Sequence, residues 1–182
     1  EEEGKEPDDA KLRELKENEI FGVFLKKAKL SKKELQNAFL SHAELQGADL
    51  SFAELQEADL RSAELQGADL SHAELQEADL RSAELQGAVL FLAKLQGADL
   101  SDANLQGAVL SHANLEGANL IGVRGDSETR LDGANLTYAN LYHSYLDETK
   151  TLRNAFVSEK EINEIIADFL KRRNKDLAVL DV

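Results

Sequence analysis

The sequence contains no cysteine, methionine or tryptophan, and its 182 residues include a single proline. Without cysteine, disulfides and thiolate chemistry are excluded, and the sequence carries no sign of the redox compartment. No apolar run approaches the eighteen or so residues that a membrane-spanning helix needs, and no signal-peptide pattern is visible. We therefore expect a cytoplasmic protein. Because methionine is absent even at position 1, we expect a processed chain or a domain cut from something longer.

Positive charge is also scarce. The 21 Lys and Arg residues are outnumbered by 35 Asp and Glu residues, which gives a formal net charge of −14. Such an acidic balance argues against nucleic acids and anionic membranes as partners, because both are negatively charged. We expect neither nucleic-acid binding nor membrane binding.

The dominant pattern is a five-residue repeat that is unbroken from about residue 38 to residue 120. Leucine occupies every fifth position from Leu40 to Leu120, and alanine precedes nearly every leucine by two residues. On an α-helix a step of five residues turns about 140°, so the leucines would leave no buried stripe. A straight strand would place Ala48 on the opposite face from Ala43. A chain that turns a corner once per repeat keeps all of these side chains inside.

A second period of about twenty residues indicates how many corners complete a coil. Glycine and glutamate alternate at every tenth position from Gly47 to Gly87, and serine and arginine do so from Ser51 to Arg81. Four repeats per coil explain this period, although a recent duplication of a twenty-residue segment would also produce it. Parallel β connections are overwhelmingly right-handed. The pattern thus predicts an all-β solenoid, a right-handed quadrilateral parallel β-helix with coils about 4.7–4.9 Å apart.

The motif Ala-(Asp/Asn)-Leu-X-X, present over roughly residues 21–146, resembles the pentapeptide-repeat family. The resemblance implies the right-handed quadrilateral β-helix, and it says little about function because most members have no known one. Members of the quinolone-resistance group imitate DNA and bind gyrase as dimers joined through C-terminal segments. That group often places phenylalanine inside, where this chain has leucine.

We expect three segments along the chain. Residues 1–20 form an acidic tail and an N-terminal capping helix, begun by Asp8 or Asp9. Residues 21–148 form the β-helix, in which 121–130 carries one residue too many and the polar residues 125–128 bulge out as a loop. Lys33 falls at an inward position of the first coil, and we expect its ammonium to reach solvent at the coil mouth. Residues 149–182 form a C-terminal helix and tail.

The C-terminal helix is predicted from a capping box at 158–161 and a helical apolar period after it. Five residues form the stripe: Ile162, Ile165, Ile166, Phe169 and Leu170. The stripe needs a partner surface. This helix either caps the open last coil or joins two copies of the chain in a homodimer.

Stacking the sequence in twenties predicts columns on the outside of the coils. Three of these columns are acidic: one contains Glu44, Glu64 and Glu84, another Asp59, Asp79 and Asp99, and a third Glu54 and Glu74. Another side breaks the acidic rule with four apolar residues in line with Phe52, His72 and His112, namely Val89, Phe91, Leu92 and Val109. An exposed apolar patch with a polar surround commonly marks a partner-binding site. The alternatives are that the loop at 121–130 covers the patch or that the apolar residues arose by neutral sequence drift and have no function.

The sequence shows no catalytic set and no metal or cofactor motif, so we expect a non-enzymatic protein without cofactors. The leading hypothesis is a rigid scaffold for an unknown protein partner. The alternative is a DNA-mimicking binder of a type II topoisomerase such as DNA gyrase. Residues 41–120 carry a net charge near −11, or about one negative charge per 1.7 Å at the strand spacing, which is close to duplex DNA. Against this, the repeat itself favours Asp or Asn before leucine.

Overall fold

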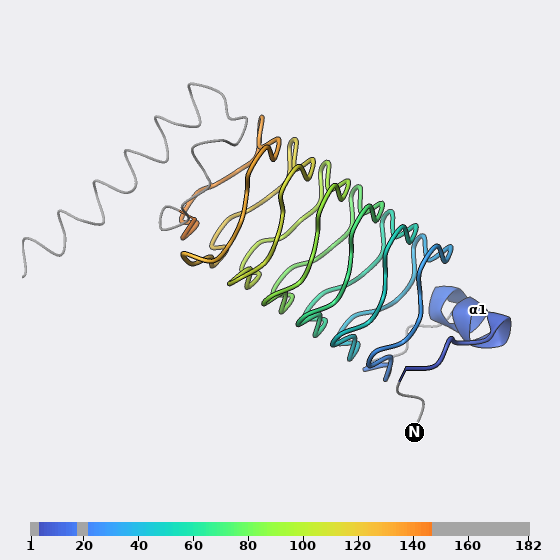
Figure 1. Ribbon diagram of the computed structural model, residues 1–182. Coiled ribbons are helices and arrows are strands. Elements are labelled where there is room, and N and C mark those ends of the chain that lie inside the picture. The colour runs from blue at the N-terminus through green and yellow to red at the C-terminus, as the bar shows by residue number, and fades with distance from the viewer. Residues whose placement is uncertain (1–3, 18–21, 147–182) are drawn as a thin grey trace, which may run out of the picture.

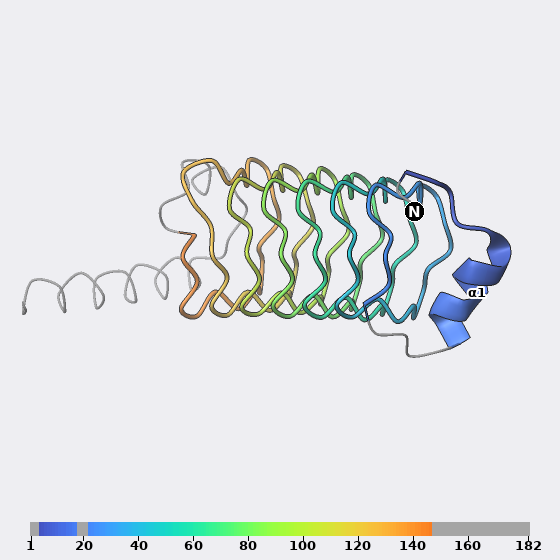
Figure 2. The same ribbon diagram turned by 90° about the horizontal axis from the view of Figure 1, so that it is seen from below.

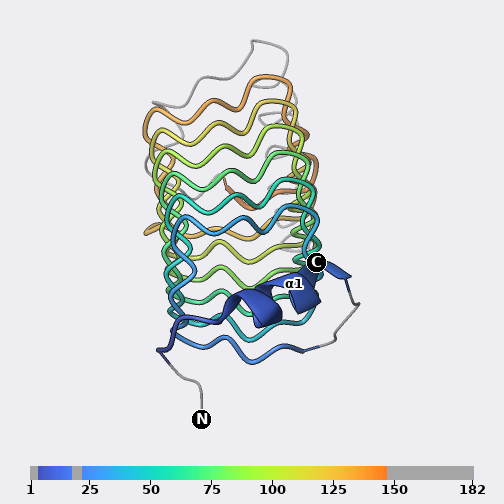
Figure 3. The same cartoon turned by 90° about the vertical axis from the view of Figure 1, so that its right-hand side faces the viewer.

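The protein is described by a computed structural model over residues 4–17 and 22–146. From residue 22 the chain winds into a stack of four-sided coils (Figures 1 and 3). Isolated parallel bridges recur at every fifth residue and, from Phe24–Glu44 to Asn104–Arg124, join positions twenty apart. The predicted β-helix solenoid is confirmed, and four bridges per coil give it four sides.

Each side carries one column of bridged residues, which we number in chain order. The first side contains Phe24, Glu44, Glu64, Glu84, Asn104 and Arg124, and the second contains Lys29, Asp49, Asp69, Val89, Val109 and Arg130. The third contains Glu34, Glu54, Glu74, Lys94, Asn114 and Asn135, and the fourth contains Phe39, Asp59, Asp79, Asp99, Asn119 and Asn140.

The interior consists of the alanines and leucines of the repeat. Between residues 38 and 120 each of them is at most 1% exposed. Each buried leucine contributes roughly 1.5–3 kcal/mol to stability, and the small alanines leave space for the leucine side chains between them. The bridged residues point outward, so in each regular repeat one surface residue lies between a buried alanine and a buried leucine.

The corners are β-turns that use residues with positive φ. Ala78 N donates to Leu75 O at 3.1 Å across one corner, and Glu77 between them has φ +59°. A positive φ at the third turn residue is typical of type II turns and favours glycine. Gly67, with φ +65°, meets this requirement without the steric cost that a Cβ carries. Glutamate at the alternate positions, such as Glu57, adopts nearly the same positive φ and carries that cost.

The N-terminal residues lie against the first coil. Helix α1 (Asp9–Glu17) begins after Asp8, whose carboxylate accepts a hydrogen bond from Lys11 N at 2.8 Å and so caps the helix. Figures 1 and 2 show α1 across the end of the stack, where Leu15 is completely buried.

Backbone hydrogen bonds tie this N-terminal segment to the first coil. Gly4 N donates to Lys26 O at 3.1 Å, Lys29 N donates to Lys5 O at 3.1 Å, and Phe39 N donates to Leu15 O at 2.7 Å. The sequence pattern gave no sign of this pairing. Lys33 extends out of the coil mouth and places its Nζ 2.6 Å from Glu6, and this contact holds the pKa of Glu6 below its ordinary value.

The extra residue of the predicted loop lies within 125–129. Asn104 and Arg124 are still twenty apart, whereas Val109 pairs with Arg130 at a separation of twenty-one. Ser127 and Glu128 are exposed at this turn, but Thr129 is completely buried. The predicted loop over 121–130 is thus a single tight turn that begins after Arg124.

Candidate interaction surfaces

The corner between the second and third sides carries a row of exposed apolar and aromatic side chains. Phe52 stacks on His72 with ring centroids 4.5 Å apart, and Phe91 makes edge contacts of 6.0 Å with both His72 and His112. We name this row the apolar strip: Phe52, His72, Val89, Phe91, Leu92, Val109 and His112. The strip follows the solenoid axis because its members come from consecutive coils.

The strip exists because several repeats depart from the polar consensus of this corner. Phe91 stands where neighbouring coils have Ser71 and Ser111, and Val89 and Val109 follow Asp49 and Asp69 in the column of the second side. Phe91 is 37% exposed, Leu92 40% and Phe52 50%, while the two valines are half-buried. The turn at 125–129 leaves Phe91 and Leu92 exposed, so it does not cover the strip.

Charged side chains flank the strip unevenly. Asp49 and Asp69 lie on the second side and Glu54 and Glu74 on the third, all beside its N-terminal half. The C-terminal half has Lys94 on the third side, which reaches back to Glu74 at 2.7 Å, and Arg130 on the second side. The surround of the strip therefore changes from four carboxylates to a mixture of cations and a carboxylate, since Arg130 lies 3.5 Å from Asp132.

The acidic column of the first side contains Glu44, Glu64 and Glu84, which bridge to one another in sequence. Side-chain amides contact these carboxylates: Gln46 donates to Glu64, and Gln86 donates to Glu84. Lys26 Nζ lies 3.9 Å from Glu44, a distance that gives little stabilisation at an exposed site. The charge of this column is thus solvated by amides and water more than neutralised by cations.

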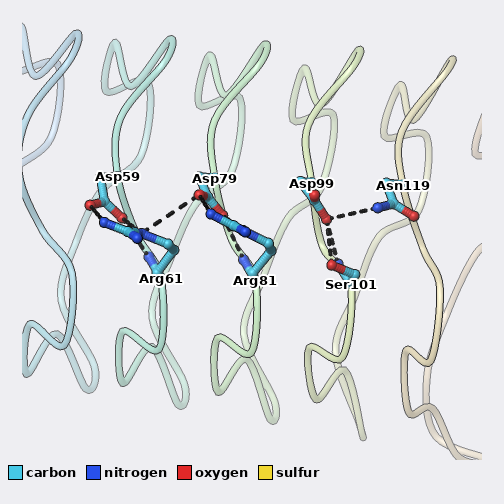
Figure 4. A network of polar contacts seen from close by, with 7 residues as sticks. All are labelled: Asp59, Arg61, Asp79, Arg81, Asp99, Ser101 and Asn119. Atoms are coloured by element: carbon cyan, nitrogen blue, oxygen red, sulfur yellow. Dashed lines mark hydrogen bonds and ion pairs between the residues drawn. The ribbon is translucent and has the colours of Figure 1, made fainter.

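The acidic column of the fourth side is different because arginines bridge it. Arg61 Nε donates to Asp59 at 2.8 Å and also lies 3.6 Å from Asp79, and Arg81 Nε donates to Asp79 at 2.8 Å (Figure 4). The hydrogen bond from Arg61 holds the pKa of Asp59 below its ordinary value, although burial acts in the opposite direction.

The last carboxylate of this column has neutral partners. Burial would raise the pKa of Asp99, but hydrogen bonds from Ser101 and Asn119 outweigh it and the pKa lies below its ordinary value (Figure 4). The sequence placed Arg61 and Arg81 beside these aspartates but gave no means of predicting that Arg61 spans two coils. Much of the formal negative charge of the fourth side is therefore paired.

The predicted cap or dimer helix, with Ile162, Ile165, Ile166, Phe169 and Leu170, lies outside the described residues. Within residues 4–17 and 22–146, no three His, Asp or Glu side chains are grouped to hold a metal ion. The same described residues include no helix with the length and apolar character needed to cross a membrane.

Comparison with known proteins agrees with this architecture. The family description "Pentapeptide repeats" matches in eight copies over residues 25–61, 53–97, 88–124 and 127–150. The chain belongs to the pentapeptide-repeat family. A search among curated proteins found no match.

Three solved structures illustrate the similarity. Rfr23, a pentapeptide-repeat protein from the cyanobacterium Cyanothece 51142, is 30% identical over 81% of this chain and 97% of its own, with a TM-score of 0.39. HetL from Nostoc sp. strain PCC 7120 is involved in heterocyst differentiation regulation. It is 32% identical over 80% of this chain and 75% of its own, with a TM-score of 0.31. QnrB1, a plasmid-mediated fluoroquinolone resistance protein, is 18% identical over 95% of this chain and 94% of its own, with a TM-score of 0.43.

Proposed function

We propose that this protein is a non-enzymatic scaffold that binds another protein through the apolar strip. Pentapeptide-repeat proteins are generally structural or binding scaffolds rather than enzymes. The observation that carries the proposal is a contiguous row of aromatic and aliphatic side chains that are exposed to solvent on consecutive coils, between charged residues of the second and third sides. Such a patch with a polar surround is typical of protein interaction sites.

The core supports this function by fixing where the strip residues lie. Each outward residue on the coil sides is flanked along the chain by buried alanine or leucine, and its backbone is bonded to the coils before and after it. The backbones of residues one coil apart therefore stay about 4.7–4.9 Å apart. A partner meets a surface whose spacing is set before binding, which reduces the ordering cost of association.

The test is a pulldown that compares the parent with V89K/F91K, followed by identification of the captured proteins by mass spectrometry. A matched control, S101K/I121K, places two lysines at the opposite corner, between the fourth and first sides. Proteins retained by the parent and the control but lost by V89K/F91K are the expected result. Identical captured sets for all three proteins would contradict the proposal.

A second candidate function is the DNA-mimicking binder of a type II topoisomerase. It is favoured by the solvated carboxylates of Glu44, Glu64 and Glu84, repeated at the coil spacing along one side. The arginine bridges of the fourth side weaken it, because they pair the carboxylates of Asp59 and Asp79. A gyrase supercoiling assay decides: unchanged supercoiling at micromolar protein would remove this candidate.

A further inference from the structure

We propose that the partner element bound by the apolar strip is an amphipathic α-helix that lies along the solenoid axis. Its basic N-terminal half lies over the acidic surround of Asp49, Asp69, Glu54 and Glu74. The inference rests on the proposed function and specifies the chemistry of the partner. Three features of the strip carry it: its bonded backbone, its repeat distance and its uneven charge.

The backbone at the strip is not open to strand addition. Val89 N donates to Ala68 O at 2.9 Å, Val109 N donates to Ala88 O at 2.9 Å, and Leu90 N donates to Val109 O at 2.7 Å. An added strand needs a free row of N–H and C=O groups at a sheet edge. The coils use these groups on one another along the axis, so a partner must be recognised here through side chains.

The repeat distance of the strip matches a helix better than a strand. The backbones of strip residues in successive coils are about 4.7–4.9 Å apart, and the ring centroids of neighbouring strip residues are 4.5 Å or 6.0 Å apart. Residues three and four apart on a helix rise about 4.5 and 6.0 Å along its axis, whereas alternate residues of a strand advance about 6.6–6.8 Å. An apolar stripe on a helix therefore stays in register with Phe52, His72, Phe91 and His112 over the whole strip, and a strand falls out of register within two coils.

The uneven charge orients the helix. Four carboxylates flank the N-terminal half of the strip, with Lys29 and Lys32 one coil before them. Lys94, which contacts Glu74, and Arg130, which lies 3.5 Å from Asp132, flank the C-terminal half. A helix carries partial positive charge at its N-terminus and partial negative charge at its C-terminus. The helix dipole and the charges along the strip are complementary when the N-terminus of the partner helix lies near Asp49 and its C-terminus near Arg130. Lysine or arginine in the first turns of the helix strengthens this orientation.

The test uses three fluorescein-labelled peptides of about eighteen residues with the same composition. The first is a helix with a leucine stripe at positions i, i+3, i+4 and i+7 and with lysines in its N-terminal half. The second has the same stripe with lysines in its C-terminal half, and the third alternates leucine with polar residues as a strand does. Fluorescence anisotropy measures their binding. We expect the first peptide to bind at least fivefold more tightly than either of the others.

The strip itself is tested with V89N/F91S/V109N, which changes no charge. The repeat already holds asparagine at the equivalent Asn104 and Asn119 and serine at Ser71 and Ser111, so the variant should fold, as circular dichroism would check. We expect its affinity for the first peptide to fall at least tenfold. The control I121S removes an apolar side chain from the opposite corner and should bind as the parent does.

The charge argument is tested with D49N/D69N against the matched pair E44Q/E64Q on the first side. We expect the first pair to weaken binding of the N-terminally basic helix and the second pair to leave it within twofold. Equal weakening by both pairs would show attraction to net charge alone and overturn the inference. Equal binding of all three peptides would also overturn it, while strip-dependent capture in the pulldown would still support the scaffold function.

Discussion

Between residues 41 and 120 every inward position of the repeat is alanine or leucine, whereas the coil over 121–146 places Val123, Thr129 and Ser144 inside. In the regular coils a corner amide finds a backbone carbonyl, as Gly87 N does with Gln106 O at 2.9 Å. Where the last regular coil meets the irregular coil, Gly107 N donates instead to the carboxylate of Asp126 at 3.0 Å. The solenoid thus tolerates an extra residue because side-chain oxygens replace the backbone acceptor that the insertion displaces.

Thr129 completes this replacement. Its buried Oγ1 donates to Leu105 O at 2.9 Å and accepts from Asp126 N at 2.9 Å. Asp126 also accepts from Glu128 N and Thr129 N, and these bonds hold its pKa below the ordinary value although burial acts to raise it. The regular coils are therefore stabilised mainly by apolar packing, and the irregular coil depends in addition on a local polar network.

The largest effect should come from the regular core. Leu75→Ala leaves a cavity between Leu55 and Leu95 in the same column, and we expect a loss of about 2–5 kcal/mol in the free energy of unfolding. Urea denaturation followed by circular dichroism measures it. A loss below about 1 kcal/mol would contradict close packing of the core, because it would require the coils to collapse around the missing side chain.

The polar network of the irregular coil should contribute less. Thr129→Val keeps the shape of the side chain but leaves Leu105 O and Asp126 N without this partner, at a cost of about 1–3 kcal/mol. Thr137→Val, at a half-buried corner of the same coil, should change stability by about 0.5 kcal/mol or less. Equal effects for the two variants would show that the Oγ1 contacts of Thr129 do not stabilise the turn.

The two regions should also differ at corner glycines of nearly equal φ. A Cβ at Gly67 (φ +65°) would meet nothing within 4 Å, whereas one at Gly133 (φ +67°) would lie 2.4 Å from His112 Nδ1. Gly67→Ala should cost about 1 kcal/mol from backbone strain alone. Gly133→Ala should cost more, because the His112 ring must move. Thermal unfolding of both variants measures the difference, and equal melting temperatures would contradict the contact.

The smallest effect concerns acid. The pKa values of Asp59 and Asp99 are lowered in the folded protein, so their contribution to stability is present above the ordinary aspartate pKa of about 4. It is lost as the pH falls through the lowered values. We expect D59N/D99N to flatten the pH dependence of unfolding below about pH 4. Superimposable profiles of parent and variant would exclude this coupling.

The sequence predicted the fold because its two periods are strict. A side chain that recurs every five residues is buried throughout only if the chain turns a corner in each repeat. The period of twenty then places Glu44 beside Glu64 and Val89 beside Val109 in neighbouring coils. These periods assign positions but not rotamers. The reach of Arg61 to two aspartates and the insertion of Phe91 between two histidines depend on side-chain geometry that no column pattern contains.

Features that occur once were also beyond prediction. The acceptor role of Asp126 has no second instance in the repeat with which to compare it. Similarly, the pairing of Gly4 and Lys5 with the first coil occurs in a segment that has no apolar period. Sequence periodicity is informative where a residue's role recurs, and the departures from it were resolved only by atomic contacts.

The N-terminal pairing has a consequence for assembly. A β-helix that ended at Lys26 and Phe39 with free backbone groups would template the last coil of another molecule, and repeated end-to-end stacking produces a filament. Gly4, Lys5 and Leu15 occupy those groups. These bonds occupy part of the edge of the first coil, so deleting residues 1–17 should increase self-association through that coil.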